Sequence, residues 1–159
     1  AEEILFGSNT INVIRKVDCP LIIIPQGFKF TIPKTILYAM DHNDHFVEDD
    51  LKLLSKIVNK HWSSLKILRI KNDDCITIPE FEDKKNMRLF FKNLDHSFHS
   101  ITNVPTALAI NSFVQIMNVD MTAMFIKKET FLKRFFKGSN TSKISHGTRV
   151  PLLIMHIDS

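Results

Sequence analysis

Glycine is scarce in this chain of 159 residues, with only four, at positions 7, 27, 138 and 147. They lie too far apart for a glycine-rich loop, in which small residues let backbone amides approach phosphate oxygens. Cysteine is scarcer: Cys19 and Cys75 form no metal-type pair and are expected to be packing residues in a reducing compartment. No apolar run approaches the roughly 20 residues of a transmembrane helix, so we expect no membrane contact and a cytoplasmic protein.

The chain also lacks a strong charge of either sign. The formal net charge is +4, with 44% apolar and 24% charged residues, the balance of a soluble globular protein. This mild charge gives no reason to expect a nucleic-acid partner. Basic residues do gather between 127 and 149, but Phe131, Leu132, Phe135 and Phe136 alternate with them at helical spacing. The cluster therefore indicates the outer face of an amphipathic helix packed on the sheet.

The residue groupings typical of enzymes and metal sites are missing as well. No Ser-His-Asp or Cys-His arrangement has supporting context, and no two carboxylates share an obvious loop. Residues 41–45 have metal-ligand types, but Asn43 and Asp44 are explained as caps of the following helix. His96 and His99 fall on opposite faces of a strand, and His156 is expected to be packed or hydrogen-bonded. We predict neither catalysis nor a bound metal.

A repeat links the two ends of the sequence. Gly7-Ser8-Asn9-Thr10 precedes Pro20 and an apolar run, and Gly138-Ser139-Asn140-Thr141 precedes Pro151 and a similar run at the same spacing. Gly-Ser-Asn-Thr is typical of a helix boundary, and the short apolar run of a buried strand. We interpret residues 1–25 as the last helix and strand of an upstream copy, 26–33 as a linker and 34–159 as a complete second domain.

Strands and helices alternate along the second domain. Short apolar runs predict strands at 35–41, 65–70, 96–101, 121–126 and 151–156. Helical periodicity predicts helices ending at Trp62, over 80–94, from Asn103 to Met117, and over 129–145. This alternation predicts an α/β domain with a mostly parallel sheet.

The order of these elements resembles that of the universal stress protein family. The resemblance rests on a buried strand ending in Ala39-Met40-Asp41, a strand after Asp120, the Gly138-Ser139 pair and the closing Val150-Pro151 run. It covers residues 34–157. It implies an open, doubly wound, five-stranded parallel sheet of order 3-2-1-4-5, with a crevice where the order reverses. It also implies a homodimer, or an internal pseudo-dimer in tandem members, formed through the last strands.

Many members of that family bind ATP through Gly-x-x-Gly, nine residues, and then Gly-Ser or Gly-Thr. If Gly138-Ser139 is the Gly-Ser pair that ends this motif, then Phe125 and Lys128 occupy the positions of its first two glycines. A phenylalanine would occupy space that a phosphate needs. We therefore predict no bound cofactor and a role in stress response through dimerisation and partner binding.

The alternative is an ATP-binding switch whose binding half is mainly upstream. The resemblance then implies that Asp41 contacts adenine. It also implies that the phosphates lie against Lys127, Lys128, Gly138 and Ser139.

Overall fold

The structure, a computed structural model, describes residues 8–126 and 149–156, except the side chains of Ser8, Ile11 and Arg15. In chain order the elements are α1 (Ser8–Lys16), β1 (Leu21–Ile23), β2 (Thr35–Asp41), α2 (Glu48–His61), β3 (Ser64–Lys71), α3 (Ile78–Phe90), β4 (His96–Thr102), α4 (Thr106–Ile116), β5 (Met121–Ile126) and β6 (Leu152–His156). The predicted helix over 129–145 lies outside the described residues. No helix in these two stretches is long and apolar enough to cross a membrane.

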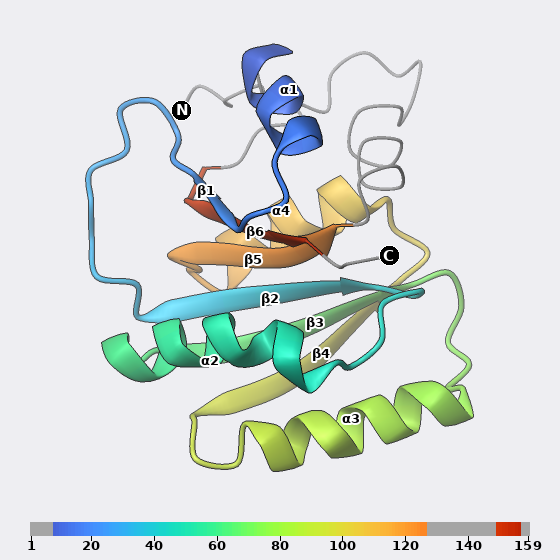
Figure 1. Ribbon diagram of the computed structural model, residues 1–159. Helices are drawn as coiled ribbons and strands as arrows, with labels where there is room; N and C mark the ends of the chain where they lie inside the picture. The colour runs from blue at the N-terminus through green and yellow to red at the C-terminus, as the bar shows by residue number, and fades with distance from the viewer. Residues whose placement is uncertain (1–7, 127–148, 157–159) are drawn as a thin grey trace.

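The strands form one six-stranded sheet in the order β1-β6-β5-β2-β3-β4 (Figure 1). Strands β2 to β6 are mutually parallel and stand in the predicted order 3-2-1-4-5. The sheet has one strand more than the five predicted for the domain, because β1 adds to its edge. The predicted doubly wound α/β fold is confirmed, and the strand order reverses between β2 and β5.

Strand β1 pairs with β6 in the antiparallel direction. The partners are Leu21 with Ile154, Ile22 with Leu153, and Ile23 with Leu152. This confirms that the apolar run after Pro20 pairs with the last strand, here within one chain. In the sequence repeat Ile22 and Leu153 are equivalent positions, so the pair has local twofold symmetry centred on them.

The two faces of the sheet are covered by different helices (Figure 1). Helices α2 and α3 cover one face, where Leu54, Met87 and Phe91 pack on Tyr38 and Ile67. Helices α1 and α4 cover the other face, where buried residues of both helices pack on the sheet: Ile14, Ala109, Ile110, Phe113 and Val114. The two layers explain why strands β2, β5 and β6 are apolar on both sides.

Helices α2 and α4 begin later than predicted. Helix α2 begins after Val47 without a side-chain cap, because the Asp44 carboxylate instead accepts from the Asp41 N–H at 2.7 Å. Helix α4 begins only after Pro105, and Asn103 does not cap it. Asn103 has a φ of 58°, whereas an N-cap residue is extended. The buried face of α4 consists of Ala109, Ile110, Phe113 and Val114, and Leu108 is 40% exposed.

Several large apolar residues are at the surface. Trp62 is 91% exposed because it ends α2 in a left-handed conformation, with φ 54°, which turns its side chain off the helical face. Val47 and Phe81 are also exposed. The prediction that both cysteines are packing residues was wrong, since Cys19 and Cys75 are exposed in short connections. Neither cysteine lies in a helix or strand, so no sheet face buries it.

Candidate functional site

The carboxyl ends of the parallel strands form a hollow beside the point where the strand order reverses. A cavity of about 370 Å³ lies at the ends of β2 and β3 and against the start of α4. Its apolar walls are Ile70, Val104 and Pro105, and its polar groups include Asp41, Asn72 and Thr106. Open parallel sheets bind ligands at this place. A ligand with a planar ring and polar edges would suit these apolar walls and polar groups.

Asp41 lies in this cavity, as a crevice residue should. Its carboxylate accepts the N–H of His42 at 2.5 Å and also contacts the His42 ring at Nδ1. Its side chain is 14% exposed. The carboxylate can still accept hydrogen bonds from a ligand, but His42 competes for one of its oxygens.

Phe125, the residue at the first predicted glycine position, belongs to strand β5. Its ring meets Tyr38 edge to face, with centroids 5.7 Å apart. It therefore packs towards the face that α2 and α3 cover. The other predicted phosphate contacts, Lys127, Lys128, Gly138 and Ser139, lie outside the described residues.

A cluster of buried charges under α3 was missed by the sequence analysis. Arg69 and Lys71 project from β3 towards α3, and their side chains are about 10% exposed. Arg69 Nη2 lies 3.3 Å from Asp83 Oδ2, and Lys71 Nζ lies 3.0 Å from Glu80 Oε2. The signal was present: residues 65, 67, 69 and 71 share one face of a strand, and positions 80 and 83 share one face of a helix.

Asp83 also holds the segment between β2 and α2. Its Oδ1 accepts the N–H of Phe46 at 3.0 Å, and the His45 ring donates from Nδ1 to Oδ2 over 3.3 Å. Arg69 Nη1 donates to the Asp44 carbonyl at 3.1 Å. The Asp83–Arg69 pair thus joins α3, β3 and the segment that follows Asp41.

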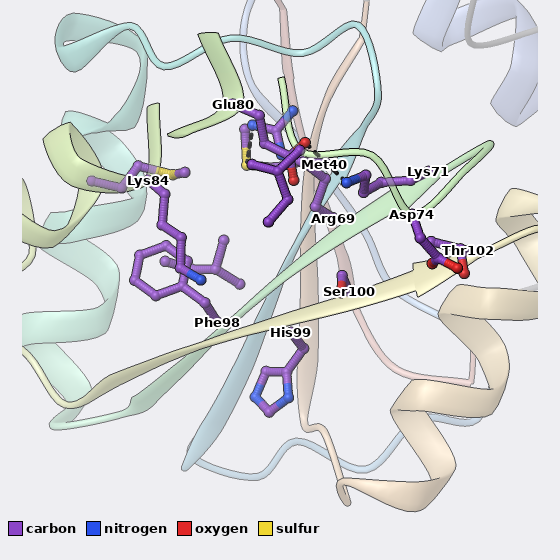
Figure 2. Close-up of a pocket in the computed structure, with 13 residues that line it drawn as sticks. Met40, Arg69, Lys71, Asp74, Glu80, Lys84, Phe98, His99, Ser100 and Thr102 are labelled. Atoms are coloured by element: carbon purple, nitrogen blue, oxygen red, sulfur yellow. Dashed lines mark hydrogen bonds and ion pairs between the residues drawn. The ribbon is translucent and has the colours of Figure 1, made fainter. Parts of the chain in front are cut away.

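Two further cavities border this cluster. One of about 180 Å³ is lined by His42, Asn72 and Thr77, and one of about 200 Å³ by Met40, Met87 and Phe98. Both share Arg69, Lys71 and Glu80. Figure 2 shows the second cavity, with Lys84 beside the Phe98 ring and His99 pointing away from the Arg69 and Lys71 side chains.

His96, His99 and His156 lie as predicted. His96 contacts the rings of Phe91 and Phe98, whereas His99 contacts Phe113 on the other face. Burial and the positive charge of Lys66 lower the pKa of His99. His156 Nε2 donates to the Ile14 carbonyl at 3.4 Å, which joins β6 to α1. Across residues 8–126 and 149–156, no three His, Cys, Asp or Glu side chains are grouped closely enough to hold a metal ion.

Comparison by sequence gives no match to a protein-family model or to a curated protein. Comparison of folds gives matches to solved structures. A universal stress protein from Archaeoglobus fulgidus superposes with a TM-score of 0.65 at 18% identity, covering 92% of this chain and 52% of that one. This chain thus spans about half the length of that protein.

Two smaller structures also superpose. A member of the universal stress protein family from Burkholderia pseudomallei matches with a TM-score of 0.50 at 10% identity, over 82% of this chain and 100% of that one. A universal stress protein from A. fulgidus in complex with dAMP matches with a TM-score of 0.49 at 10% identity, over 80% and 100%. The strand order, the helical layers and the first of these superpositions show that this chain has the fold of the universal stress proteins.

Proposed function

We propose that this chain is a universal stress-type domain that acts in stress response through association with another copy and through partner binding. It acts without catalysis. The observation that carries the proposal is the symmetric pairing of β1 with β6. Residues 1–25 are the last helix and strand of an upstream copy, 26–33 the linker and 34–159 the complete domain.

The register of the pair supports this origin of β1. In the repeat, Leu21 is equivalent to Leu152 and Ile23 to Ile154. Leu21 pairs with Ile154, and Ile23 pairs with Leu152. An interface between two identical surfaces requires this reciprocity, in which residue i meets j and j meets i. A strand added to an edge at random would match it only by coincidence.

Association then follows from the edge that β1 presents. In the described part of the chain β1 is the last strand on its side of the sheet. Its Ile22 and the adjacent Ile24 are 54% and 64% exposed. An apolar edge with unpaired backbone groups binds another strand. A homodimer, or a pseudo-dimer within a longer chain, would cover it.

Charge on this edge should abolish association. The parent chain is expected to be larger than a monomer by light scattering at tens of micromolar, and Ile22→Lys with Ile24→Lys to be monomeric, because edge lysines oppose strand pairing. The control is Leu89→Lys, an equally exposed position on α3, at 62%. A monomeric parent, or a control that dissociates equally, would refute the proposal.

Nucleotide binding is the second candidate, favoured by Asp41 in the 370 Å³ cavity. Phe125 opposes it, because the family resemblance assigns this phenylalanine to a glycine position of the phosphate loop. We expect titration calorimetry with Mg-ATP to give no saturable binding tighter than about 100 μM, or about 5.5 kcal/mol. Tighter binding that Asp41→Asn removes would establish the switch instead and overturn the cofactor-free proposal.

A further inference from the structure

We propose that the cleft beneath the N-terminal half of α3 binds a small organic oxyanion. The apolar body of such a ligand lies against Met40, Met87 and Phe98, and its carboxylate or phosphate binds Lys71 and Arg69. This site faces α3, whereas the Asp41 cavity lies against the start of α4. It is independent of the nucleotide question.

Two buried cations side by side are the first observation. Arg69 and Lys71 are alternate residues of β3, so they share a face and stand about 6.6 Å apart along the strand. Both residues are more than nine-tenths buried, since Arg69 is 9% and Lys71 is 8% exposed. Burying a charge costs more than one ion pair returns, so such pairs contribute little net stability. Their position beside two cavities favours a role in binding.

The cleft has the chemical asymmetry that an organic anion requires. Figure 2 shows the cations and Glu80 at one end and the Phe98 ring at the other. Lys84 Nζ and Arg88 Cζ lie 5.4 Å and 5.6 Å from the centroid of that ring, so two further cations contact the apolar end. Thr77, the N-cap of α3, lines the adjoining 180 Å³ cavity, so the positive end of the helix dipole adds to the field.

Helix α3 is held over the cleft mainly by charge. In its C-terminal half Met87 is buried, and Phe91 follows it into the core. In its N-terminal half Ile78 and Phe81 are 77% and 65% exposed, and Glu80 and Asp83 pair with Lys71 and Arg69 of the sheet. The first turn, which carries Glu80 but precedes Asp83, has no buried residue and can move without exposing the core.

Glu80 acts as the internal competitor of the ligand. Its side chain is 18% exposed, more than the 9% of Lys71, so the carboxylate can turn to water. Asp83 cannot do so, because it also accepts from Phe46. Binding thus exchanges one partner of Lys71: the Glu80 carboxylate leaves, and the oxyanion of the ligand replaces it.

The probes are phenyl phosphate, phenylacetate and neutral benzyl alcohol, titrated into the whole chain by ligand-observed NMR. We expect saturable binding of the two anions, with the tighter one identifying the head group, and none of the alcohol. Glu80→Gln should tighten anion binding about fivefold or more, because the competing charge is gone. A purely structural ion pair would give no such gain.

Lys71→Met should abolish anion binding, with circular dichroism confirming the fold. The control is Lys66→Met on the opposite face of β3, which should bind as the parent does. Three results would overturn the proposal: no anion binding by either the parent or Glu80→Gln, equal binding by Lys71→Met, or equal loss in Lys66→Met.

Discussion

Asp83→Ala lowers the free energy of unfolding by about 3–5 kcal/mol, because it leaves the buried guanidinium of Arg69 without its carboxylate. Arg69 is 9% exposed and lies 3.3 Å from Asp83, so water cannot replace the lost charge. The substitution also removes the acceptor of the Phe46 N–H. Urea denaturation followed by circular dichroism measures the loss. Fluorescence of the one tryptophan is unsuitable, because Trp62 is already exposed.

Two variants test whether the loss comes from the unpaired charge. Asp83→Leu combined with Arg69→Met should recover much of the stability, since apolar pairs often replace buried ion pairs without cost. Asp49→Ala removes an exposed carboxylate that pairs with Lys52 on α2, and should unfold like the parent. If Asp83→Ala unfolds like Asp49→Ala, the cluster does not hold α3 to β3.

Alkaline unfolding should coincide with ionisation of the single tyrosine. Tyr38 is 1% exposed, and burial, followed by the negative charge of Asp44, raises its pKa well above the ordinary value of 10.0. The pKa of Tyr38 is higher in the folded state than in the unfolded state. Its contribution to the free energy of unfolding therefore falls once the pH exceeds the pKa of the unfolded state. The contribution is thus complete below about pH 10 and is lost as pH rises through the folded pKa.

The measurement follows phenolate absorbance and circular dichroism in one titration. Both should change together in a single cooperative step above pH 10, whereas the chain in denaturant should titrate near 10 without a step. Phenolate formation near pH 10 with the circular dichroism unchanged would mean that water reaches Tyr38 in the folded protein.

The sheet could be predicted from the sequence because its strands are buried on both faces. Such strands are short continuous apolar runs, as in Tyr38-Ala39-Met40 or Leu152-Leu153-Ile154, which the surrounding polar segments delimit. The resemblance implied that the last strands of two copies pair, and the repeat identified residues 21–24 as one of those strands. Helix ends were predicted less well, because capping depends on backbone conformation: Asn103 is a favourable N-cap residue, yet its positive φ excludes that role.

The candidate sites show the same limit. Asp41, which lies in the cavity at the end of β2, was predicted as a site residue from the family resemblance. The Arg69 and Lys71 cluster was not, because charged residues at the end of a strand are usually solvated. Only the packing of α3 over β3 buries them and supplies Glu80 and Asp83 as partners. Contacts between elements that are distant in the sequence are difficult to predict from a single sequence.

The pairing of β1 with β6 also sets an order of events in folding. Leu21 pairs with Ile154, which is far from it in the sequence. During synthesis β1 is therefore made long before β6, the strand with which it pairs. Until β6 is made, the edge of β1 that pairs with it is open to other chains. Pro20 and Pro25 border the apolar run 21–24, and proline interrupts the hydrogen-bonded ladders by which such segments aggregate. The two prolines thus limit the length of the edge that another chain could extend before β6 pairs with it.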